Sequence, residues 1–65
     1  MVETIGINIK RLREESGYSQ NELAKLLKIP QSLLWRYESG GSVPNVINAA
    51  KLAGFFGITV EELIK

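Results

Sequence analysis

Apolar residues recur at helical spacing along the chain, and glycine, proline and short polar segments divide them into blocks. Ile5, Ile9 and Leu12 lie four and three residues apart, which is the spacing of one apolar helix face. Gly17 follows this block, and glycine readily adopts the left-handed conformation that ends many helices. The pattern therefore predicts a first helix over about residues 5–16.

A second block begins with a sequence typical of a helix start. Ser19 and Glu22 form the S-x-x-E pattern of a capping box, in which each side chain bonds the backbone N–H of the other residue. The block predicts a helix over about residues 20–27, whose inward positions are Leu23, Ala24 and Leu27.

Pro30 separates this helix from the next one. A residue before proline avoids helical dihedral angles, so Ile29 should be extended, while proline itself is tolerated at a helix start. A third helix is predicted over about residues 31–39, with Leu34 and Tyr37 facing inward, and the glycine pair that follows ends it.

Two further helices complete the pattern. Asn45 is a candidate N-cap and Gly57 a candidate end for a fourth helix. A second capping box, from Thr59 to Glu62, opens a short fifth helix anchored by Leu63. The positions that repeat at helical spacing in the fourth helix are Val46, Ala49, Ala50, Ala53 and Phe56.

The composition agrees with one small domain. No segment shows strand alternation, and 65 residues leave no room for a second core, so residues 1–65 are expected to form a single all-α domain of five short helices. A chain of this size buries only about 60% of its unfolded surface, and without cysteine it gains nothing from disulfides. Because cysteine and histidine are both absent, no metal cluster, cofactor or small-molecule ligand is expected.

Charge and hydropathy bear on which partners the protein can have and in which compartment it is expected. The formal net charge of +1 says little about partners. Lys10, Arg11 and Arg13 cluster near the start and acidic residues lie near the end, for which ordinary surface charge is the simplest interpretation. No apolar run approaches the roughly 20 residues of a membrane span, and the first residues do not resemble a signal peptide. A soluble cytoplasmic protein without membrane contact is therefore expected.

Residues 20–38 also meet the physical demands of a helix-turn-helix. In this motif a turn of three or four residues joins two helices, and the second helix enters the major groove of DNA. Ala24 is small where the two helices would cross, Ile29 supplies an apolar plug for the turn, and Leu34 would hold the second helix from below. The opposite face of the second helix is polar and free for contacts.

The stretch SQNELAKLLKIPQSLLWRYESG resembles the helix-turn-helix of the phage repressor and Cro family. The resemblance implies a compact five-helix lambda-repressor-like fold and a sequence-specific DNA-binding transcription regulator of bacteria or phages, with double-stranded DNA as partner and repression as the expected direction. Each motif alone is weak, but their order and spacing over about 60 residues are specific. Further matching segments are Leu12-Arg13, Gly17, Pro44, Leu52-Ala53, Phe56-Gly57-Ile58 and Thr59-Val60-Glu61-Glu62-Leu63.

The resemblance also implies roles for particular residues. Gln20 matches a position that grips a DNA phosphate, and its amide is expected to touch Gln31 as well. Ser39 matches the loop that approaches the DNA backbone. Arg13 and Glu38 match a pair that joins the first helix to the end of the third. The base-reading positions of the family fall on Gln31, Ser32, Trp35 and Arg36.

The chemistry of these residues agrees with the resemblance. The amide of Gln31 can pair with adenine, and the guanidinium of Arg36 can fork onto guanine. Lys10 and Arg11 are either solvated or contact phosphates that flank the site. Arg13 and Glu38 form either an exposed ion pair of about 0–1 kcal/mol or, as we favour, a buried pair that orients the third helix.

Three positions depart from the family pattern. Lys28 stands where the family prefers glycine, so lysine either adopts a positive φ or the turn differs. Pro30 replaces the usual serine or threonine cap. Trp35 replaces a small polar residue, and the sequence leaves open whether it contacts DNA or marks a protein interface, where aromatic residues are enriched.

Ile47 and Phe55 point away from the apolar stripe predicted for the fourth helix. Isolated exposed apolar residues are normal, but these two, near Val60 and Ile64, form a candidate homodimer patch.

Two other classes of function are weighed against the regulator. An interaction module, such as an antitoxin or a coactivator that keeps the fold, would account for Trp35 and the low net charge, but it would have little need for the polar set of the third helix. An enzyme is not expected, because the sequence offers no nucleophile–base pair, no metal-ligand spacing and no phosphate-cradling glycine loop.

Overall fold

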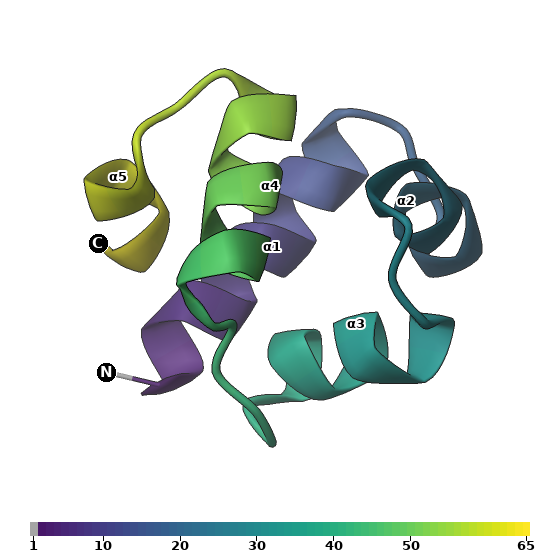
Figure 1. Ribbon diagram of the computed structural model, residues 1–65, viewed down its shortest axis with the longest axis horizontal. Coiled ribbons are helices and arrows are strands. Elements are labelled where there is room, and N and C mark those ends of the chain that lie inside the picture. Colours follow the sequence, from purple (N-terminus) through teal and green to yellow (C-terminus); the bar gives the residue numbers. More distant parts are fainter. Residues whose placement is uncertain (1) are drawn as a thin grey trace.

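In a computed structural model, which describes residues 2–65 and the side chains of residues 4–65, the chain folds into helices joined by short loops (Figure 1). No strand occurs in the described residues, which confirms the all-α prediction. The first helix starts three residues earlier and ends one residue earlier than the apolar stripe suggested. The helices are α1 (Val2–Glu15), α2 (Gln20–Leu27), α3 (Gln31–Ser39), α4 (Val46–Phe56) and α5 (Val60–Ile64).

Local capping chemistry determines where several of these helices begin. The hydroxyl of Ser19 accepts from the amide of Glu22 and the carboxylate of Glu22 accepts from the amide of Ser19, so the predicted capping box of α2 is complete. An equivalent box, formed by Thr59 and Glu62, starts α5. The N-cap of α4 is Asn45, whose side chain accepts from a backbone amide one turn later.

The ends of four helices carry a residue in the left-handed conformation. Three of these residues are glycines, Gly17, Gly40 and Gly57, with φ between 71° and 85°. The fourth is Lys28, with φ 59° and ψ 46°, so the turn keeps its left-handed geometry although lysine replaces glycine.

The core lies between the helices and contains the inward residues predicted for α2 and α3. The expectation for α4 was partly wrong: Val46 is 79% exposed and Ala50 is also exposed, whereas Leu52 is buried. The inward face of α4 follows the three- and four-residue steps from Ala49 through Leu52 and Ala53. The buried cluster comprises Ile5, Ile9, Leu23, Ala24, Leu27, Leu34, Tyr37, Leu52 and Leu63.

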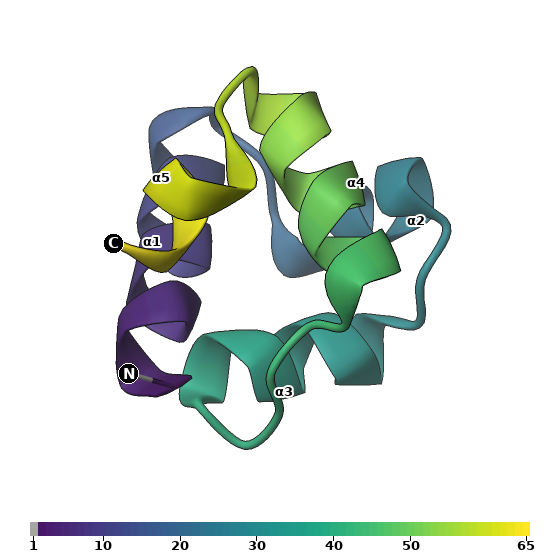
Figure 2. The ribbon, with the colours of Figure 1, turned by 60° about the vertical axis from the view of Figure 1, so that its left-hand side comes forward.

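α3 lies along one edge of the molecule in both views, packed against α1 and α2, while α5 packs on α1 and α4 away from it (Figures 1 and 2). α1 and α3 meet closely at Gly6, where an added Cβ would come far too near the carbonyl oxygen of Tyr37. A buried hydrogen bond of 2.7 Å from Asn8 Nδ2 to the carbonyl oxygen of Leu63 ties α1 to α5. None of the helices in residues 2–65 combines the length and the apolar character needed to cross a bilayer.

Candidate nucleic-acid interface

The outward face of α3 carries a continuous set of free side chains. Leu34 and Tyr37, at 0% and 3% exposure, point into the core and fix the rotation of the helix. This rotation leaves Trp35 57% exposed and places the other predicted base-reading residues on the surface. Because residues four apart are neighbours on a helix, the set forms two adjacent pairs, Gln31 with Trp35 and Ser32 with Arg36.

A hollow of about 140 Å³ opens beside the second half of α3. Three elements contribute to it: the middle of α1, the first residue of α2 and the end of α3. Three residues predicted to contact phosphates, which come from distant parts of the sequence, meet here with Trp35. The lining residues are Lys10, Gln20, Trp35, Glu38 and Ser39.

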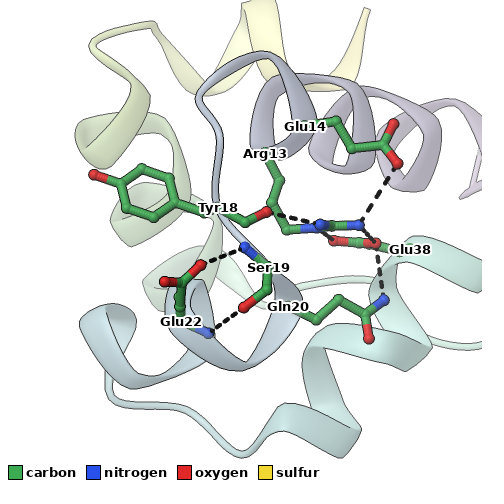
Figure 3. Close-up of polar contacts among 7 residues, drawn as sticks. All are labelled: Arg13, Glu14, Tyr18, Ser19, Gln20, Glu22 and Glu38. Carbon is green, nitrogen blue, oxygen red and sulfur yellow. Dashed lines mark hydrogen bonds and ion pairs between the residues drawn. The ribbon is translucent and has the colours of Figure 1, made fainter.

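Glu38, which lines this hollow, is at the centre of a polar network (Figure 3). Arg13 donates two hydrogen bonds to the Glu38 carboxylate, from Nε to Oε2 at 2.6 Å and from Nη2 to Oε1 at 3.0 Å. The two side chains are only 11% and 4% exposed. Arg13 Nη1 also donates to the carbonyl oxygen of Tyr18 at 2.9 Å. The pair therefore connects α1, the loop after α1 and the end of α3.

Electrostatics and hydrogen bonding both stabilise the charged form of the Arg13 guanidinium. The hydrogen bond to Glu38 raises the pKa of the Arg13 guanidinium, burial opposes this effect, and the negative charges of Glu38 and Glu14 add to it. In the described side chains, no buried polar atom lacks a hydrogen-bond partner.

Gln20 is part of the same network, at variance with one expectation from the sequence. Its Nε2 donates to Glu38 Oε1 at 3.0 Å, and no bond to Gln31 forms. The carboxylate can only accept, so this bond fixes which end of the Gln20 amide points at Glu38. The sequence contained a signal for this contact, because Glu38 was already assigned to the region where the first and third helices meet.

Arg11 lies outside the hollow. Its Nη2 donates to Asn8 Oδ1 at 3.3 Å, and its Nη1 lies 3.6 Å from the carboxylate of Glu15. The side chains of this ion pair are 53% and 63% exposed, so water screens their attraction. Arg11 lines a neighbouring groove on α1 together with Lys10, which lies at the boundary of the two depressions.

Pro30 and Ser39 are the residues that the sequence singled out at the two ends of α3. Pro30 is an extended N-cap residue with φ −63° and ψ 142°, and it makes no side-chain cap bond. The hydroxyl of Ser39 donates to the carbonyl oxygen of Arg36 at 3.2 Å, which holds Ser39 against the end of the helix.

The candidate dimer patch lies on α4, and its two side chains differ in exposure. Ile47 is 66% exposed, whereas Phe55 is 36% exposed because its ring packs edge-on against Tyr18 and Phe56, at centroid distances of 5.4 and 5.3 Å. The sequence did not predict Lys51, whose Nζ donates to the carbonyl oxygen of Leu27 at 3.3 Å and so joins α4 to the end of α2.

The described residues contain no group of three or more acidic, histidine or cysteine side chains that could hold a metal ion. Apart from the Glu38 carboxylate, which Arg13 pairs, the polar groups that line the hollow or lie on the outward face of α3 are amide, hydroxyl and cationic groups, which suit hydrogen bonding to base edges and phosphate oxygens.

Comparison with known proteins places the chain in a family. The helix-turn-helix family profile matches residues 9–63. An HTH-type transcriptional regulatory protein of Pyrococcus horikoshii is 45% identical over 60 residues, which are 92% of this chain and 18% of that protein. The prophage-derived HTH-type transcriptional regulator YonR of Bacillus subtilis is 32% identical over 60 residues, which are 92% of this chain and 56% of that protein. The chain thus spans between about a fifth and about half the length of these relatives.

The structural comparison agrees over nearly all of both chains. The restriction-modification controller protein C.AhdI of Aeromonas hydrophila is similar with a TM-score of 0.87 and 31% sequence identity, and the match covers 95% of this chain and 94% of that one. The family profile covers far more than half of the residues, including both helices of the motif and the turn between them. The chain therefore belongs to the helix-turn-helix family.

Proposed function

We propose that this chain is the sequence-specific DNA-reading domain of a transcription regulator and that it inserts α3 into the major groove. The observation that carries the proposal is the outward face of α3, where Gln31, Ser32, Trp35 and Arg36 are all exposed on a helix anchored from below by two buried side chains. Helix-turn-helix domains dock with this helix in the groove.

In this proposal, base recognition is divided along α3. Gln31, at the start of the helix, pairs with the N6 and N7 edge of adenine, and Arg36 forks onto O6 and N7 of guanine. Ser32 lies beside Arg36 and can bond either kind of base edge. Each good bidentate contact contributes about 1–3 kcal/mol of discrimination against the wrong base.

The hollow beside α3 receives a backbone phosphate. Lys10 and Gln20 supply an ammonium and an amide N–H around one opening, and Ser39 supplies a hydroxyl once it turns away from the carbonyl oxygen of Arg36. The Glu38 carboxylate that lines the hollow does not repel the phosphate strongly, because Arg13 neutralises it through two hydrogen bonds. The ring of Trp35 forms a wall of the hollow, where it can pack on a deoxyribose or a thymine methyl group. Arg11 contacts a flanking phosphate after releasing Glu15.

Repression in the cytoplasm of a prokaryotic or phage-infected cell is the simplest activity of such a domain. A domain that fills the major groove of a promoter excludes other proteins without further contacts, whereas activation requires an additional surface. Homodimerisation through the α4 patch would place two copies of α3 on half-sites about 34–36 Å apart. The exposure of Ile47 supports this arrangement.

A randomised-duplex selection tests the proposal. Wild-type protein should select one motif, and Gln31→Ala and Arg36→Ala should each relax that motif at a separate base position. Lys65→Ala, which removes a charge near the C-terminus and away from α3, is the matched control (Figure 1). Binding that is weak, blind to sequence and unchanged by both α3 variants would refute the proposal.

A protein-interaction module is the second candidate, because Trp35 is more than half exposed. In that case Trp35→Ala would abolish capture of a protein partner, and no duplex would be selected. The selection experiment therefore separates the two candidates.

A further inference from the structure

Lys28 is the single non-glycine residue with a positive φ among residues 2–65. The other three left-handed positions are glycines, for which this conformation carries no steric penalty. In any other residue the Cβ approaches the following carbonyl oxygen, so the conformation is unfavourable. Within residues 2–65, the turn between α2 and α3 is thus the one place where such a residue stands in place of glycine.

The fold itself gives no reason for a lysine at this position. The Lys28 amide donates to the carbonyl oxygens of Ala24 and Lys25, and glycine would make the same bonds. The side chain is exposed. Within the described side chains, all ion pairs involve Arg11 or Arg13, so no carboxylate neutralises the Lys28 ammonium.

The position of Lys28 relative to α3 suggests what the ammonium does. The turn leads directly into the first residue of α3 (Figure 1). The hollow proposed to hold a phosphate is lined by Trp35, Glu38 and Ser39 from the other half of that helix. Nine helical residues span roughly 13 Å, and the major groove of DNA is about 12 Å wide. A helix of this length that crosses the groove brings its two ends close to the two opposite sugar–phosphate backbones.

We propose that Lys28 binds a phosphate of the DNA strand opposite to the strand held in the hollow. The inference rests on the proposed function and adds to it a second anchoring point, at the N-terminal end of α3. The ligand is a backbone phosphodiester, so the contact sets position and affinity and carries no base information. The unfavourable backbone conformation is retained because glycine would relieve it but would lose the cation.

Salt titration of three variants tests this contact on two probes, the duplex selected by the wild type and poly(dA–dT). Lys28→Gln keeps a long polar side chain and removes the charge. It should make the negative slope of log K against log salt shallower by about 0.9 per protomer. This corresponds to binding about eightfold weaker at 0.1 M salt and nearly unchanged at 1 M. Lys28→Arg should retain the slope, and Lys65→Gln, which removes the same charge away from α3, should leave it unchanged.

A fourth variant separates a role in DNA binding from a role in folding. Lys28→Gly should raise Tm by about 4 °C or more, because glycine relieves the left-handed conformation, and it should still weaken both complexes as Lys28→Gln does. A purely structural role would instead make Tm and affinity change together.

The outcomes keep the two proposals distinct. If wild-type protein binds neither duplex, the proposed function fails and the Lys28 contact fails with it. If wild-type protein binds and Lys28→Gln retains the full salt slope, the Lys28 contact alone is overturned. A loss confined to the selected duplex would also overturn it, because that result indicates a base contact.

Discussion

Gly6 and Gly54 both lie inside helices, and replacing each with alanine should change stability in opposite directions. A Cβ at Gly54 would meet no atom within 4 Å, so Gly54→Ala should gain the full difference in helix propensity, about 1 kcal/mol. A Cβ at Gly6 would come well under 3.0 Å from the carbonyl oxygen of Tyr37 and 3.1 Å from that of Glu38. These atoms are backbone and cannot rotate away.

The size of the Gly6→Ala effect follows from what must move. Ordinary contact begins at 3.4 Å, so α1 and α3 must separate where they bury Ile9 and Leu34. A gap of about 0.5–1 Å already forfeits a quarter to a half of the van der Waals attraction across it. Overpacking of this kind costs about 3 kcal/mol at its upper end. Subtracting the helix-propensity gain of about 1 kcal/mol leaves a net loss of about 2 kcal/mol.

Thermal unfolding followed by far-ultraviolet circular dichroism measures both effects. A domain of this length has a total stability of about 3–10 kcal/mol, so the Gly6→Ala protein should still fold. Its Tm should fall by about 8–16 °C, whereas that of Gly54→Ala should rise by about 4–8 °C. Because Gly54 is exposed on α4, the measurement should be repeated at two protein concentrations to exclude an effect on association. Equal Tm changes for the two variants would refute the packing argument.

Three further predictions concern the polar network, the cap of α2 and the tryptophan. Glu38→Ala should cost about 3–5 kcal/mol in urea unfolding, because it leaves the guanidinium of Arg13 buried without its partner, and a loss below about 1 kcal/mol would mean that water already screens the pair. The hydrogen bonds from Ser19 lower the pKa of the Glu22 carboxyl below its ordinary 4.5, so the stabilisation is present above that pH and disappears as the pH falls through the depressed value. Glu22→Gln, which keeps the capping geometry, should therefore lose less stability on acidification than wild type, and parallel pH profiles would contradict this. Trp35 is the only tryptophan of the chain, so its emission should change when duplex DNA is added at constant protein concentration, whereas a change on dilution without DNA would indicate a protein interface.

Features encoded within a few residues could be predicted from the sequence. The starts of α2 and α5 follow from Ser19 and Thr59, whose capping boxes need only three following residues. The end of α2 at Lys28 was also predictable, because the motif requires a turn there whichever residue occupies it.

Features that depend on how helices cross could not be predicted in the same way. Nearly every residue of α4 is apolar or small, so periodicity could not decide between Val46 and Leu52 as inward positions. The start of α1 was missed because its apolar stripe begins only at Ile5. The Gln20–Glu38 bond joins residues 18 positions apart and depends on the packing of α2 against α3. The base and phosphate contacts of the site residues remain predictions.

Two hydrogen bonds tie α4 to the helix-turn-helix, one from Lys51 Nζ to the carbonyl oxygen of Leu27 and one from Asn48 Nδ2 to the hydroxyl oxygen of Tyr37. If a second copy docks on the outward face of α4, the tilt of α4 sets how far apart and at what mutual twist the two α3 helices stand. The number of base pairs between paired half-sites would then depend on residues that read no base themselves. Substitutions at Lys51 or Asn48 would then change the operator spacing among related proteins while every base-reading side chain stays the same.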